Sequence, residues 1–188
     1  LLGQGVTAED RGAGVYRYSN EVGSIQFHSD GSFSAEFTAG AFPLGEDRVK
    51  SCAELLEKLN FEGEVLSQQE NALVFRQTWN GYHLFTQQVT LEIEEGCLKA
   101  MTSGRRLIGE PVEDTTRQPI TVVTALIDFL NGLNALGDVC SRIDTIVPGY
   151  VATTSLSGPM TLVPVWQITT DTGSYQLDTM TGELSRVT

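Results

Sequence analysis

Residues that could do chemistry are few and scattered in this sequence. The two histidines, His28 and His83, both fall in segments whose pattern predicts β-strands. A zinc site needs further ligands at set spacing, such as a paired histidine on a helix, and none is present in the sequence. We therefore expect structural or surface histidines and no metal site.

Motifs for nucleophilic catalysis and for phosphate binding are also missing. No Gly-x-Ser-x-Gly elbow occurs, and the spacing gives no basis for assembling a Ser-His-Asp triad. Gly12-Ala13-Gly14 precedes no predicted helix and lacks the Gly-Lys-Ser/Thr ending of a phosphate loop. We expect no catalytic residue, no cofactor and no enzyme activity.

The three cysteines are Cys52, Cys97 and Cys140, which are spaced too widely for a zinc knuckle. Because their number is odd, they cannot all pair within one chain. Cys52 falls on the apolar side of a predicted helix, where a thiol usually packs as a small hydrophobe. We favour core cysteines over a disulfide, and the count leaves the cellular compartment open.

Composition limits the classes of partner. The chain has 188 residues, 40% of them hydrophobic, which is enough apolar surface to fold unaided. Its net charge of −12, from 24 acidic and 12 basic residues, opposes contact with phosphate and with anionic lipid. Nucleic acid is therefore not an expected partner. The acidic residues are scattered, which is typical of a solvated surface rather than a cation site.

The first elements that position these residues are a hairpin and a helix. After a Gly-rich segment over 1–20, which we expect to be a flexible lead-in, residues 24–37 read as two strands joined at Asp30-Gly31. From Asp47 to Asn60 apolar residues recur at three- and four-residue spacing, which predicts an amphipathic helix. Its apolar positions are Val49, Cys52, Leu56 and Leu59. Alternating strands with hairpin turns at Asn80-Gly81 and Glu95-Gly96 follow.

The second half repeats this order. Pro119 suits the first position of a helix that should run to about Leu136 and end at Gly137. We expect this to be the more deeply buried helix, because its apolar surface is too broad for one shallow contact. That surface includes Ile120, Val123, Leu126, Ile127, Phe129, Leu130 and Leu133. A strand over 142–147 and three extended segments over 149–183 complete the chain.

The predicted fold class is α+β, with two helix-plus-antiparallel-meander units and an N-terminal β-hairpin. The expected boundaries are a flexible lead-in over 1–20, the hairpin and first unit over 21–110, and the second unit over 111–188. We expect the whole to form one compact, two-lobed domain. The repeated order also suggests an internal duplication, although sequence identity between the halves is slight.

Aromatic residues are the candidates for contact with a partner. Trp79 and Trp166 lie on predicted strands beside other apolar groups, which favours core packing over an interface. Tyr150 and Tyr175 are candidate partner-binding residues, since tyrosine is enriched at recognition surfaces. For these two tyrosines, core packing and partial exposure stay open.

A pattern of turns and aromatic residues runs through most of the chain from the first hairpin onward. Its parts are Phe75-Arg76-Gln77 followed by Asn80-Gly81-Tyr82 and Leu84-Phe85, a strand ending near Gly96, the apolar helix after Pro119, Ile143 before Gly149-Tyr150, and Pro164-Val165-Trp166 leading to Thr181-Gly182-Glu183. In this pattern the chain resembles the YycI-like family (YycH/YycI), extracytoplasmic regulators of the WalK (YycG) sensor kinase of Gram-positive bacteria. The terminal part also resembles PepSY-type modules.

The resemblance implies a non-enzymatic regulatory domain without a cofactor. It implies that the domain lies on the extracytoplasmic face of the cell membrane, tethered by an N-terminal transmembrane helix that is absent from this chain. The implied partners are a sensor histidine kinase and a YycH-type regulator, and the implied action is modulation of the kinase by protein contact. The alternative is a PepSY-like module that inhibits a peptidase or binds a peptide. A small-ligand or lipid pocket beside the broad helix is a third hypothesis.

Overall fold

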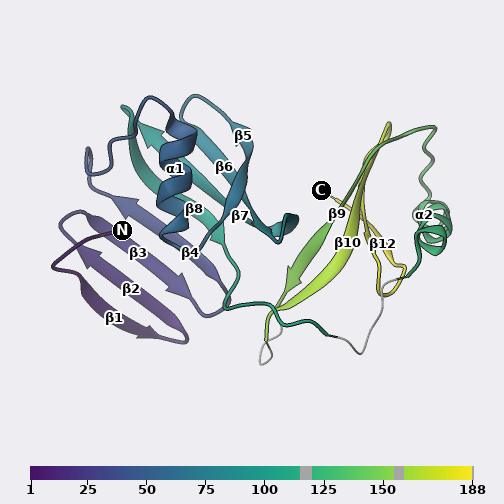
Figure 1. The fold of residues 1–188 in the computed structure, drawn as a ribbon, viewed down its shortest axis with the longest axis horizontal. Helices are drawn as coiled ribbons and strands as arrows, with labels where there is room; N and C mark the ends of the chain where they lie inside the picture. Colours follow the sequence, from purple (N-terminus) through teal and green to yellow (C-terminus); the bar gives the residue numbers. More distant parts are fainter. Residues whose placement is uncertain (115–119, 155–158, 188) are drawn as a thin grey trace. The chain divides into compact units, whose positions relative to one another are not determined.

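The computed structural model describes residues 1–114, 120–154 and 159–187. Strands dominate these residues, with 51% of them in strands and 14% in helices. The chain divides into two compact units, Leu1–Gly109 and Glu110–Thr188 (Figure 1).

The first unit is an eight-stranded antiparallel sheet with one helix. The strands follow the spatial order β1-β2-β3-β4-β8-β7-β6-β5. Their bounds, with the helix, are β1 Thr7–Gly12, β2 Val15–Asn20, β3 Gly23–His28, β4 Ser32–Phe37, α1 Arg48–Glu57, β5 Gly63–Gln68, β6 Ala72–Trp79, β7 Tyr82–Glu94 and β8 Cys97–Arg105. The β4–β8 pair, with Ser32 opposite Arg105 and Ala35 opposite Met101, joins an early meander to a late one.

Helix α1 confirms the amphipathic helix predicted from the sequence. Asp47 caps it, because its side chain accepts a hydrogen bond of 3.0 Å from the backbone N–H of Lys50. Cys52 and Leu56 are buried at 0% and 1% exposure. They pack against the sheet core that includes Phe75 and Met101. Figure 1 shows α1 lying across one face of this sheet.

The described residues of the second unit form a helix and a four-stranded antiparallel meander in the order β9-β10-β11-β12. The bounds are α2 Val122–Leu136, β9 Ile143–Thr153, β10 Thr161–Thr170, β11 Ser174–Asp178 and β12 Leu184–Arg186. Phe129 and Leu133 of α2 pack against Ile168, Tyr175 and Leu177, which form the core of this unit. The helix ends at Gly137 in the left-handed conformation, as the sequence predicted.

The predicted fold class, α+β with two helix-plus-meander units and an N-terminal hairpin, is wrong, and the first unit departs from it most. Four strands precede α1 there, and β4 pairs with β8, so the strands before and after the helix form one sheet. The fold is consequently mostly β, with strands far outweighing the two short helices of the described residues. Local periodicity could not show this, because the β4–β8 pair joins residues far apart in the sequence.

The expected flexible lead-in over 1–20 is also wrong, because β1 and β2 lie there and pair with each other. Their turn places Ala13 at φ 51° and Gly14 at φ 74°, a geometry that suits a tight hairpin. The signal was weak because all six residues of β1 are exposed and several are charged. Charged side chains of this kind are common on edge strands, where they discourage pairing with other chains.

The start of the second helix also differs from the prediction. Pro119, the predicted first helical residue, lies outside the described residues. The helix begins at Val122, and Thr121 caps it by accepting a hydrogen bond of 3.3 Å from the backbone N–H of Thr124.

Candidate protein-binding surface

Helix α2 presents apolar side chains on two sides. The inner side carries Ala125, Phe129 and Leu133, whose exposure is 0%, 1% and 4%. The opposite side carries four aliphatic residues with 39% to 69% exposure. These four residues, named the outer face of α2 from here on, are Val123, Leu126, Ile127 and Leu130.

The spacing of the residues explains both sides. Ala125, Phe129 and Leu133 recur every four residues and form the stripe that meets the sheet. The outer face repeats at three or four residues from Val123 to Leu130, on the side where a surface helix normally carries polar residues. Asp128 is the single charged residue of α2. The sequence predicted deep burial for this helix, and that prediction is wrong for its outer face.

Close packing holds α2 in place against the end of the meander. A Cβ on Gly132 would overlap the side chain of Leu184, so glycine at this position permits the close approach of α2 to β12. The ring of Phe129 meets that of Tyr175 edge to face, with centroids 6.0 Å apart. The outer face is therefore carried on a firmly seated helix.

A polar cluster fixes the C-terminal end of α2. Tyr175 donates a hydrogen bond of 3.0 Å from its hydroxyl to Asp138 Oδ2. Arg186 donates from Nε and Nη2 to the two oxygens of Asp138, both at 2.7 Å, and from Nη2 to the carbonyl of Leu136 at 2.9 Å. This two-point contact ties β12 to the residue that follows the helix, and it satisfies one of the last helical carbonyls.

The same cluster shifts the pKa values of its members. Hydrogen bonds from Arg186 and then Tyr175 lower the pKa of Asp138 below its ordinary value. Burial, followed by the hydrogen bond to Asp138, raises the pKa of Tyr175. Asp138 in turn raises the pKa of Arg186. Each shift has a structural cause, since each group serves to close the end of the helix.

Tyr150 and Tyr175, the candidate partner-binding residues from the sequence, differ in burial. Tyr175 is 2% exposed and belongs to the core, so the alternative of a partly exposed anchor is wrong for it. Tyr150 is half-buried on β9, opposite Pro164 of β10. Trp166 is half-buried and packs against the core of the second unit. Trp79 is also half-buried, at the end of β6.

Sequence reasoning did not identify the outer face of α2. The signal was present, because a fifteen-residue helix with one charged residue is apolar on almost every side. Such a pattern has two physical explanations, namely burial on all sides or burial on one side with a docking surface on the other. The structure shows one side of α2 buried and the other side exposed.

The histidines and cysteines hold separate positions in the first and second units. His28 Nε2 lies 2.9 Å from Gln26 Nε2. His83 Nδ1 lies 2.8 Å from Glu64 Oε1 but has no hydrogen-bond partner. In the part of the chain that the structure describes, no three metal-ligating side chains come together. Cys52 is buried, and burial raises the pKa of its thiol to about 11.

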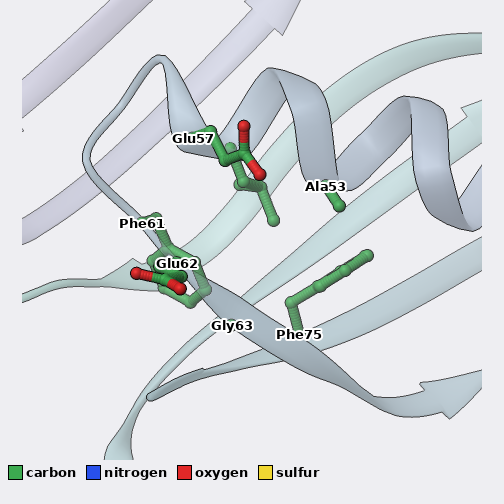
Figure 2. A pocket seen from close by; sticks show the side chains of 7 residues that line it. Ala53, Glu57, Phe61, Glu62, Gly63 and Phe75 are labelled. Atoms are coloured by element: carbon green, nitrogen blue, oxygen red, sulfur yellow. The ribbon is translucent and has the colours of Figure 1, made fainter. Parts of the chain in front are cut away.

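The first unit has two surface hollows, one too small for a typical small-molecule ligand and the other open to solvent. One, between α1 and the strands, has a volume of about 40 Å³ and includes Phe61 and Phe75 in its lining (Figure 2). Binding pockets for small molecules usually measure about 300–1,000 Å³. The other, of about 370 Å³, is lined largely by polar residues near Ser103 and Arg105. Neither is lined by α2, beside which the sequence placed a possible apolar pocket.

None of the helices in the described ranges is long and apolar enough to cross a lipid bilayer.

Comparisons with known proteins leave the family open. No protein-family model matches the chain, and no curated protein matches it. The solved structures with a distant likeness include the C-terminal domain of Bacillus megaterium YpeB and an uncharacterized protein from Eubacterium rectale. Each has a TM-score of 0.47 and 14% identity over 97% of this chain, and the match covers 88% and 76% of the two solved chains. Likeness at this level carries no argument about function, and nothing in it is specific to YycI or YycH.

Proposed function

We propose that this chain is a non-enzymatic binding module that acts through protein contact at the outer face of α2. The observation that carries the proposal is the exposure of four aliphatic residues on a helix whose other side is fully packed. Contiguous exposed apolar surface is unfavourable in water and is typical of sites where another molecule binds. A docking surface gives this exposure a physical reason.

Two arginines with perturbed pKa values in the first unit have structural roles, which favours a binding module over an enzyme. The pKa values of Arg76 and Arg106 are lowered by burial. The guanidinium of Arg76 lies 5.2 Å from the ring centroid of Phe85, and that of Arg106 lies 5.0 Å from that of Phe27. Perturbed groups at an active site would be expected to converge on one cleft. These two arginines stack on separate aromatic rings instead.

The setting and the partner follow the resemblance to YycI-like proteins. We propose that the module lies outside the cytoplasmic membrane, tethered by a transmembrane helix of the full-length protein. We propose that it modulates a sensor histidine kinase, together with a YycH-type regulator. The support for this finer assignment is the pattern of turns and aromatic residues in the sequence.

A second candidate is a PepSY-like module that inhibits a peptidase or binds an extended peptide. The observation that favours it is strand β5, which in the described residues pairs with β6 alone and carries Leu66 at 43% exposure. An extended peptide could add to this edge through its backbone. Inhibition of a secreted peptidase by the purified chain would support this candidate, and absence of inhibition at high protein concentration would count against it.

Site-specific photocrosslinking in the full-length protein tests the first proposal. A photoreactive phenylalanine analogue placed at Leu130 should crosslink to a membrane sensor kinase. The matched control carries the analogue at Val139, which is 81% exposed just beyond the end of α2. Crosslinks from Leu130 that recover only cytosolic enzymes, or equal crosslinking from both positions, would contradict the proposal.

A further inference from the structure

The acidic charge of the second unit indicates which charge a partner of the outer face of α2 should carry. We infer that this face binds an amphipathic helix of a partner protein, with an aliphatic stripe bordered by lysine or arginine. The inference rests on the proposed function, and it adds the shape and charge of the partner.

The shape of the surface favours a helix as the occupant. The outer face is a stripe whose members repeat at three or four residues, from Val123 through Leu126 and Ile127 to Leu130. This is the spacing at which side chains of two packed helices interlock. The stripe spans about two helical turns, or roughly 11 Å, so two to three turns of a partner helix would cover it.

The charge of the second unit favours a cationic partner. Residues 110–188 contain nine acidic residues and three arginines, which gives a net charge of −6, and they contain no lysine. Both arginines that the structure describes in this unit are paired, Arg142 with Asp144 at 2.6 Å and Arg186 with Asp138 at 2.7 Å. The outer face is therefore an uncharged stripe on an acidic unit.

Two carboxylates close to α2 remain available to a cation. Asp128 lies on the helix itself, and Glu183 precedes Leu184, which α2 contacts through Gly132. Neither forms an ion pair with another described residue. Both carboxylates lie on the side of α2 that meets the β11–β12 turn, because the Asp128 carboxylate lies against Gly182. They therefore add to the acidic field of the second unit and do not border the outer face directly.

The same charges disfavour the other occupants of an apolar helix face. A second copy of the chain would bring an identical acidic unit to the contact, and like charges would oppose it. Helices that lie on a bilayer usually carry lysine and arginine on their polar side, and α2 carries neither. Anionic lipid would repel the acidic surround as well.

Designed peptides test the inference directly. The probe is a fluorescent helical peptide of about 18 residues, with leucine along one stripe and lysine on both sides of it. One control peptide has the same composition in scrambled order, and another has glutamate in place of every lysine. Anisotropy with the 188-residue chain should show binding of the striped lysine peptide alone, and added salt should weaken it.

Two variants of the chain serve as the matched pair. The double substitution Ile127→Ser and Leu130→Ser should weaken binding of the lysine peptide about tenfold or more, because both side chains lie within the contact. Val139→Ser changes a valine that is 81% exposed just beyond the end of α2 and should leave the affinity unchanged. Thermal melts followed by circular dichroism should show that both variants keep the parent fold.

The outcomes separate the inference from the function on which it rests. Equal binding of the lysine and glutamate peptides would overturn the cationic partner and leave the outer face as a protein-binding surface. Binding of the lysine peptide that the double substitution does not weaken would overturn the inference, and crosslinks from Leu130 that recover only cytosolic enzymes would overturn the proposed function. A dimer in sedimentation that the double substitution dissociates would replace the partner helix with a second copy. Binding to phosphatidylglycerol vesicles that the same substitution abolishes would replace it with a membrane.

Discussion

Helices α1 and α2 differ in the side chains that they expose to solvent. Helix α1 buries Cys52 and Leu56 and presents lysine and glutamate residues to solvent, as a helix that only covers a sheet should. Helix α2 buries Phe129 on one side and exposes Leu130, its next residue, on the other. Both helices are held against a sheet by one buried apolar stripe, so a single stripe is sufficient to hold a helix in place. The second apolar stripe of α2 is therefore in excess of what its own fold requires.

The largest expected effect comes from the buried stripe of α1. Leu56→Ala removes a side chain that is 1% exposed and should lower the free energy of unfolding by about 3 kcal/mol. The cause is the lost transfer free energy together with the cavity left against the sheet core. Urea denaturation followed by circular dichroism measures the change. A loss below about 1 kcal/mol would mean that α1 is not firmly seated.

Cysteine labelling tests the same stripe without a substitution. Because burial raises the pKa of Cys52 to about 11, its thiolate fraction at pH 8 should be about one hundredth of that of an ordinary thiol. Cys97 and Cys140 are partly exposed and serve as internal controls in the same molecule. Mass spectrometry after timed alkylation should show them modified first. Equal rates at all three thiols would show that α1 opens readily.

The seat of α2 can be disturbed through Gly132. Alanine is a better helix former than glycine by about 1 kcal/mol, which alone would stabilise the helix. The added Cβ would meet the side chain of Leu184, and overpacking of this kind costs about 1–3 kcal/mol. Gly132→Ala should therefore destabilise the chain by about 1 kcal/mol in urea denaturation. A more stable variant would show that α2 and β12 leave room for a methyl group at position 132.

A smaller effect should appear at acid pH. The pKa of Asp138 is lowered in the folded chain by Arg186 and Tyr175, so its contribution to stability is present above the unfolded pKa near 4. That contribution is lost as the pH falls through the lower, folded pKa. Asp138→Asn should lower the Tm at pH 6, and the difference from the parent chain should shrink toward pH 2. A constant difference would show that the charge of Asp138 has no part in closing the helix.

The smallest effect is expected on the outer face of α2. Leu130→Ala changes a leucine with 58% exposure and should alter the free energy of unfolding by less than about 0.5 kcal/mol. The matched comparison is Leu56→Ala, which makes the same chemical change on a buried stripe. A loss as large as that of Leu56→Ala would show that the outer face is packed within the protein, and the docking proposal would fail with it.

Local features of the fold were predictable from the sequence because neighbouring residues determine them. The turns at Gly31, Gly81 and Gly96 all have the positive φ that their sequences indicated. The start of α1 at Asp47 and the end of α2 at Gly137 follow from capping chemistry that a few adjacent residues supply.

Other features depend on partners that the sequence does not place side by side. The β4–β8 pair and the edge strand β1 have no local signature, since one is a long-range pairing and the other is exposed and charged. The exposure of the outer face of α2 was hidden for another reason. An apolar residue such as Ile127 or Leu130 gives the same sequence pattern whether its side chain is buried within its own chain or exposed on the surface.

The β4–β8 pair also has a consequence during synthesis. Strand β4 ends at Phe37 and its neighbour β8 begins at Cys97, so about 60 residues must be made before β4 gains its second neighbour. At ordinary rates of translation this delay is about 3–12 seconds. Throughout that interval one edge of β4 is unpaired in the nascent chain. Glu36 is the charged residue of β4 that can discourage pairing of this edge with another chain. Until β8 has been synthesised, the edge of β4 can pair incorrectly with another strand.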